Sequence, residues 1–219
     1  MTQRADSDIA EFLPPAEWFD KWWEPAEFAA SVHAHKQTVP IVEFMCRSQL
    51  KPLREAWAAA KFATILSQDR PVSINLERDR FPDFNLRVRG EAQLFELVEA
   101  DRAGRHRSQE YRFAAASEAA GQSLELEHFD PAEEEQAAIP AIAHVIELKA
   151  KKYYKPAPHL LVYVNFWLDG EPRITNLQAV QITERWRDAF TGFWLLWGSF
   201  IVRLWPRPAK IRDQSLWGR

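Results

Sequence analysis

The sequence predicts an α/β fold, in which helices flank a mixed central β-sheet. Three patterns predict it: apolar residues at helical spacing, strand-like runs between them, and a hairpin sequence in residues 81–101. In chain order these patterns give a helix, three strands, a helix, a buried strand, a helix and two strands. At 219 residues, with 47% hydrophobic and 27% charged residues, the chain is long enough to bury one sizeable core.

Residues 1–40 are expected to form an aromatic, acidic extension. The segment PPAEWFDKWWEPAEF combines three prolines with Trp18, Trp22 and Trp23, which indicates short helical turns lying across a surface. Residues 41–219 are then expected to form a single α/β domain, because nothing in the chain requires a second core.

The first elements of that domain are a helix and a strand. Residues 42–67 are helix-like, and Pro52 marks a break or a fresh helix start. Residues 72–77 alternate Val, Ile and Leu with Ser, Asn and Glu, which predicts a strand with one buried face.

The hairpin follows that strand. A two-residue turn at Arg89 and Gly90 suits the freedom of glycine at positive φ, and the pairing it sets places Asp83 opposite Glu96. Directly paired residues have Cβ atoms about 4.5–5.5 Å apart. The same register gathers the apolar residues on one face: Phe84, Leu86, Val88, Phe95 and Leu97. Because a one-residue slip would break both patterns, the pairing is supported twice.

The next stretch, from residue 108 to about 136, is polar and weakly patterned, which indicates a helix fragment and a long acidic loop. Pro140 suits a first helical position. After it, a stripe recurs at helical spacing: Ile142, Val145, Ile146, Lys149, Ala150 and Tyr153. This stripe predicts a helix that packs on the sheet.

The carboxyl-terminal elements are a central strand, a helix and two further strands. Residues 159–168 form a near-continuous apolar run, as expected for a strand covered on both faces. Residues 175–190 are helix-like, and residues 193–197 and 200–205 are strand-like around a Gly198-Ser199 turn.

Composition and apolar patterning indicate where in the cell the protein is located. Cys46 is the single cysteine, so an internal disulfide and a multi-cysteine zinc site are excluded. The amino terminus lacks the apolar core of a signal peptide, and the longest apolar run, residues 189–202, is shorter than the roughly 20 residues of a spanning helix. We therefore expect a cytoplasmic protein without a membrane partner.

The order of elements also carries a family resemblance. Pro82-Asp83 opens the second strand, Phe95-Glu96-Leu97-Val98-Glu99 lies on the third, and a lysine-bearing helix and a buried strand follow. Over roughly residues 43–168 this order resembles the PD-(D/E)xK nuclease superfamily. The resemblance implies a restriction-endonuclease-like core and hydrolysis of DNA phosphodiester bonds. It also implies that Asp83 and Glu96 are catalytic residues that bind Mg²⁺ or Mn²⁺.

The lysine of that family's motif is missing, because Val98 stands at its position. Lys149 could replace it, since a long side chain on the apolar stripe can extend its ammonium toward the carboxylates. Glu99 could serve instead, although strand alternation directs it to the opposite face unless a bulge intervenes. The third alternative is an inactive site. A further acid from the first long helix, Glu43 or Glu55, is also plausible.

Basic residues near the ends of predicted elements are candidate DNA contacts. They comprise Arg102, Arg105 and Arg107 after the third strand, and Lys151 and Lys152 at the end of the lysine-bearing helix. Alternatively, the arginines belong to a solvated loop and the lysines complement the helix macrodipole. Asp83 and Glu96 could likewise be part of a solvated sheet face.

Two functions follow. The first is a metal-dependent nuclease acting on DNA. The second is a catalytically inactive module of the same fold that binds nucleic acid or a protein partner. Aromatic surfaces could also support a homodimer, since the chain has ten Trp and fourteen Phe.

Overall fold

Seven strands form one sheet, and their order in space follows their order in the chain. The computed structural model describes residues 6–78, 81–121, 131–166, 171–206 and 209–212. The strands are β1 (Val72–Leu76), β2 (Phe84–Val88), β3 (Glu91–Asp101), β4 (His159–Asn165), β5 (Gly192–Trp197), β6 (Phe200–Trp205) and β7 (Ala209–Arg212). β4 is parallel to β3 and β5, whereas the other neighbouring pairs are antiparallel. The prediction of an α/β fold with a mixed sheet is confirmed.

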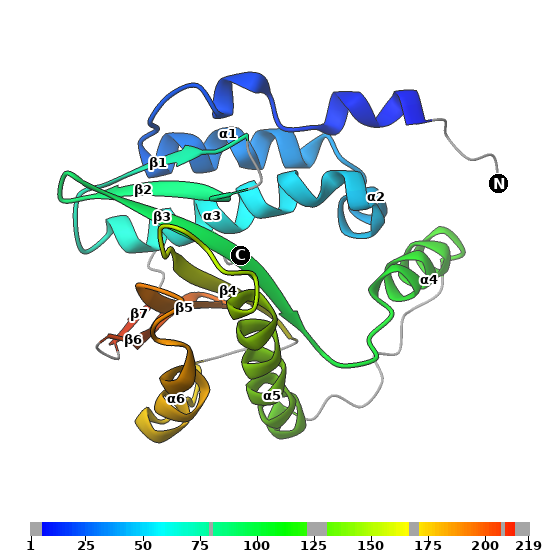
Figure 1. The fold of residues 1–219 in the computed structure, drawn as a ribbon. Coiled ribbons are helices and arrows are strands. Elements are labelled where there is room, and N and C mark those ends of the chain that lie inside the picture. The colour runs from blue at the N-terminus through cyan, green and yellow to red at the C-terminus, as the bar shows by residue number, and fades with distance from the viewer. Residues whose placement is uncertain (1–5, 79–80, 122–130, 167–170, 207–208, 213–219) are drawn as a thin grey trace.

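Helices cover both faces of this sheet (Figure 1). The helices are α1 (Pro25–Gln37), α2 (Ile41–Cys46), α3 (Lys51–Ser67), α4 (Arg107–Ala119), α5 (Pro131–Ala150) and α6 (Asn176–Thr183). α1, α2 and α3 bury one apolar cluster against the sheet, and α5 and α6 bury a second cluster against its other face. α4 follows the end of β3 and packs against α2 (Figure 1).

The amino-terminal segment packs into the first of these clusters. Short 3₁₀ turns are present at Asp6–Phe12 and Ala16–Trp18, as predicted. Trp18 and Phe28 are fully buried, and Trp23 forms a β-bridge with Ile74. Residues that the sequence suggested were an extension therefore share a core with α3.

The hairpin has the predicted register. Val88 pairs with Glu91 and Phe84 pairs with Phe95. The two turn residues, Arg89 and Gly90, have φ values of 53° and 91°. Positive φ at both central positions matches the twist of the two strands, which is why glycine is favoured there.

We expect Gly90→Ala to lower the free energy of unfolding by about 1 kcal/mol, because an L-residue is strained at this φ. No atom lies within 4 Å of the added Cβ, so packing should contribute little. Urea denaturation measures the change, with Glu91→Ala in the exposed neighbour as the control. An unchanged midpoint would show that the turn does not need glycine.

The start of α5 differs from the prediction. The helix begins at Pro131, and Pro140, predicted as its first residue, lies inside it. Glu133 and Glu134 favour the observed start, because acidic side chains in the first turn complement the helix dipole. Tyr153, placed by the sequence on the packed stripe, lies beyond the helix end with a φ of 58° and is 82% exposed.

The carboxyl-terminal strands agree with the predicted pattern. β4 lies between β3 and β5, and β5 and β6 flank the predicted turn at Gly198. β7 was not predicted. Among the residues that the structure describes, no helix has the length and apolarity needed to cross a membrane.

Candidate functional site

The candidate site lies beside the start of β2, where β3 continues past it. Beyond Phe95, β3 pairs with β4, and within the described residues no strand covers its other edge. Asp83 stands at this point. Its N–H donates to the carbonyl oxygen of Phe95 at 3.0 Å, and its carboxylate accepts the N–H of Leu97 at 2.6 Å. Continuing the register by one residue places Asp83 opposite Glu96, as the sequence predicts.

Glu96 lies on the face of β3 that α5 covers, because the flanking Phe95 and Leu97 belong to the opposite cluster. Its side chain is 5% exposed and forms an ion pair with the ammonium of Lys149. The Tyr154 hydroxyl donates to the same oxygen, Oε1, at 2.9 Å. Burial, then the charge of Glu96 and this hydrogen bond, raise the pKa of Tyr154, so the hydroxyl remains a donor.

A third carboxylate, Glu55 on α3, approaches from the other face of the sheet. Burial, followed by the negative charges of Glu55 and Glu96, raises the pKa of Asp83 to about 7. Burial lowers the pKa of Lys51, but the hydrogen bond to Glu55 and the charges of Glu55, Asp83 and Glu96 outweigh it, so the pKa is raised. Of the two acids left open by the sequence, Glu55 is near the pair, whereas Glu43 binds Arg47 at 2.6 Å.

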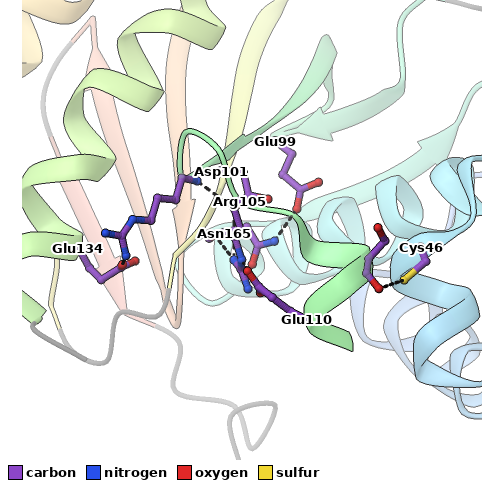
Figure 2. Close-up of polar contacts among 9 residues, drawn as sticks. Cys46, Glu99, Asp101, Arg105, Glu110, Glu134 and Asn165 are labelled. Carbon is purple, nitrogen blue, oxygen red and sulfur yellow. Dashed lines mark hydrogen bonds and ion pairs between the residues drawn. The ribbon is translucent and has the colours of Figure 1, made fainter. Parts of the chain in front are cut away.

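The alternatives for the missing lysine have different positions. Val98 packs against the apolar cluster beneath α5. Glu99 accepts a hydrogen bond from the amide of Asn165 on β4 at 2.8 Å (Figure 2). β3 and β4 pair without a register shift over this stretch, so alternation keeps Glu99 on the face opposite Glu96. Lys149 is the residue that the fold brings to the carboxylates.

Two of the candidate arginines take part in ion pairs that tie elements together (Figure 2). The side chain of Arg105 is 7% exposed and donates to Asp101, Glu110 and the carbonyl oxygen of Asn165. It thereby joins the ends of β3 and β4 to α4. Arg102 pairs with Glu134 at 2.6 Å. Arg107 is the first residue of α4, and its side chain lies outside the described part of the structure.

The two candidate lysines at the end of α5 differ in surroundings. Lys151 pairs with Glu147 at 2.9 Å and does not line the cavity beside the carboxylates. Lys152 is exposed and does line it. Lys152 makes no ion pair with a residue that the structure describes.

That cavity has a volume of about 560 Å³ and opens along the uncovered edge of β3. It shares Glu55, Leu97 and Lys149 with the carboxylate site. Its other lining residues come from several elements: Lys36, Ile41, Phe44, Met45, Lys51, Arg54, Trp57, Ala58, Val98, Glu99, Tyr111, Lys152, Tyr163 and Asn165. A site with both carboxylates and cations therefore adjoins an aromatic cavity.

The carboxylates suit a hard divalent cation. Glu96 Oε2 is buried and has no hydrogen-bond partner, and such a group normally requires one. Burial, and then the charges of Glu55 and Glu96, raise the pKa of Asp83, so a cation would relieve the repulsion among these acids. In the described ranges, no group of three His, Cys, Asp or Glu side chains is placed so that it could hold a metal ion. Mg²⁺ does not need such a group, because it binds through one or two carboxylates and keeps several waters.

Of these residues, Lys51 and Tyr154 were not predicted from the sequence, whereas Glu55 was one of the two acids that it left open. Lys51 and Glu55 are spaced i, i+4 on α3, a signal that gives their pairing but not what they face. Tyr154 reaches Glu96 only because the chain turns after α5 ends. Comparison of the chain with protein-family models, with curated proteins and with solved structures found no match.

Proposed function

We propose that this protein is a metal-dependent nuclease that hydrolyses DNA phosphodiester bonds. The observation that carries the proposal is the meeting of Asp83, Glu96 and Lys149 at the open edge of β3. Two carboxylates can hold Mg²⁺, and a nearby ammonium can stabilise the charge that develops on a phosphate during hydrolysis. The resemblance of residues 43–168 to the PD-(D/E)xK superfamily is consistent with these roles.

Asp83 and Glu96 would hold the Mg²⁺, with Mn²⁺ as a substitute. When bound, the cation polarises the phosphate and lowers the pKa of a water ligand. The ammonium of Lys149 would donate to a phosphate oxygen and stabilise the charge that develops there. Tyr154 would keep Glu96 oriented, because its hydroxyl holds one carboxylate oxygen and leaves the other toward the cation.

The cations around the cavity favour a polyanionic substrate. Lys36, Lys51 and Lys152 line it together with Lys149, although the whole chain has a net charge of −3. Local clusters of this kind attract phosphate even when the net charge is negative.

The test is DNA cleavage by the full-length protein. Supercoiled plasmid and single-stranded DNA are incubated with Mg²⁺ or Mn²⁺, and cleavage is expected that stops with EDTA and is lost in Glu96→Gln. Calorimetric titration with the metal gives a second readout. The absence of both metal binding at millimolar concentration and cleavage of either DNA would rule out the nuclease.

A second candidate is a module of the same fold without catalysis. The observation in its favour is the direct pairing of Lys149 with Glu96, which already neutralises one carboxylate, together with Val98 at the usual lysine position. Such a module would bind DNA or a protein partner without metal. DNA binding that is unchanged by Mg²⁺, with no cleavage, would favour it.

A further inference from the structure

The cavity beside the carboxylates has an aromatic side that the proposed chemistry does not use. Trp57 on α3 and Tyr163 on β4 meet edge to face there, with ring centroids 5.5 Å apart. Both side chains are half-buried, and Tyr111 of α4 and Phe44 of α2 complete the aromatic lining. A solvent-accessible group of aromatic rings is what stacking of a nucleobase needs.

Cations line the cavity around this aromatic side, together with the carboxylates Glu55 and Glu99. The Lys36 ammonium lies 5.4 Å from the Phe44 ring centroid and 6.0 Å from that of Trp57. Lys152 stands at the end of α5, near Lys149. The cavity can therefore bind a base on its rings and a phosphate on its lysines at the same time.

The size of the cavity limits which form of nucleic acid can enter it. About 560 Å³ is in the range of roughly 300–1,000 Å³ that holds one small molecule. A base inside a duplex cannot enter such a cavity, because its two faces are covered by its neighbours. It must first be unstacked, as in a single strand or a flipped nucleotide.

We propose that this cavity binds one unpaired nucleotide of a DNA strand, with its base against Trp57 and Tyr163. Its placement beside the scissile phosphate rests on the proposed nuclease function. The protein then acts on single-stranded DNA, or on a nucleotide flipped out of a duplex, in preference to intact duplex.

Binding without metal tests the proposal independently of cleavage. A fluorescein-labelled single strand of eight thymidines is titrated with the full-length protein in EDTA, and fluorescence anisotropy is recorded. Trp57→Leu is expected to weaken binding by about 5- to 150-fold, the equivalent of about 1–3 kcal/mol for one stacked base. Trp22→Leu, outside the cavity lining, should bind like the wild type.

A strand with one abasic nucleotide, moved along its length, identifies the stacked base. At one position, the abasic nucleotide should weaken binding to the wild type. The same strand should bind Trp57→Leu no more weakly than the intact strand does. Lys152→Gln should weaken binding of both strands, whereas Lys155→Gln, which removes the same charge outside the cavity lining, should not. Because Lys152 is exposed, this pair remains informative if Trp57→Leu fails to fold.

The outcomes separate this inference from the nuclease proposal. Tight single-strand binding that depends on Trp57, without cleavage in Mg²⁺, would retain the nucleotide site and remove the nuclease. Cleavage of intact duplex at the same rate as single strands, unaffected by Trp57→Leu, would retain the nuclease and remove the nucleotide site. Cleavage of a duplex only at a mismatched position would identify a flipped nucleotide as the source of the base. Equal binding by folded Trp57→Leu and wild type would overturn the nucleotide site.

Discussion

Asp83→Asn is expected to abolish metal-dependent cleavage and, at the same time, to stabilise the metal-free protein at pH 8. The loss of activity should be about 1,000-fold, because the substitution removes a carboxylate proposed to hold a metal that supplies several kcal/mol of transition-state stabilisation. The gain in stability follows from the raised pKa of Asp83, about 7 against an ordinary value of 3.8. Asparagine keeps an oxygen that can accept the N–H of Leu97.

The sign of the stability effect depends on pH. Below pH 3.8 the carboxyl is protonated in both states, so it contributes no difference. Between pH 3.8 and 7 the unfolded chain ionises first, so the wild type loses stability as pH rises and the cost is constant above pH 7. A shift of this size corresponds to at most about 4 kcal/mol, and we expect about 2 kcal/mol because Glu55 and Glu96 share the repulsion.

Urea denaturation at pH 8 and pH 4, with and without Mg²⁺, checks both parts. Asp83→Asn should exceed the wild type at pH 8, match it near pH 4, and gain no stability from Mg²⁺, whereas the wild type should gain. Equal destabilisation of the variant at both pH values would mean that the carboxylate is structural. Glu77→Gln serves as the matched control, because Glu77 is an acid near the same hairpin that binds Asn85.

Lys149→Met is expected to lower the cleavage rate by about 100- to 1,000-fold, the cost of removing one donor to a developing negative charge. Stability should fall by about 3 kcal/mol at pH 8, because the Glu96 side chain is 5% exposed and would lose its ion pair with Lys149. Lys155→Met, which changes a lysine outside the site, should alter neither quantity by much.

A second substitution tests whether the position or only the charge of the lysine matters. In Val98→Lys with Lys149→Met, the ammonium is moved to the strand position where the PD-(D/E)xK motif has its lysine. Val98 lines the cavity, so a lysine there has space to extend. Recovery of at least a tenth of the lost rate would show that Lys149 replaces the strand lysine. Full activity in Lys149→Met alone would exclude a catalytic role.

The hairpin could be predicted because its signals are local. Gly90 favours the two-residue turn, and the turn sets the register of the strands. The apolar face agrees with that register, so the sequence alone predicts that Asp83 lies opposite Glu96. Lys149 was predictable from helical spacing alone, since it shares a stripe with Ile142 and Ile146. The roles of these residues remain predictions.

What the sequence did not reveal depends on how distant segments pack. The sequence suggests that Arg105 is a loop cation, but Asp101, Glu110 and Asn165 bind it, and Asn165 is 60 positions away in the chain. Trp57 and Tyr163 are 106 positions apart and meet only through the packing of α3 on β4. Pro140 marked a helix start by its type, whereas the acidic first turn at Pro131 determines where α5 begins.

The ion pair between Glu96 and Lys149 also affects the order in which the site can assemble. Asp83 and Leu97 are separated by 14 positions, so the acids can meet as soon as the hairpin closes. Lys149 is 53 positions from Glu96 and arrives only when α5 docks on the sheet. Closing a longer loop costs more entropy and slows folding. A partly folded chain would therefore carry Asp83 and Glu96 side by side without the ammonium of Lys149, and the proposed site would be complete only when α5 has docked.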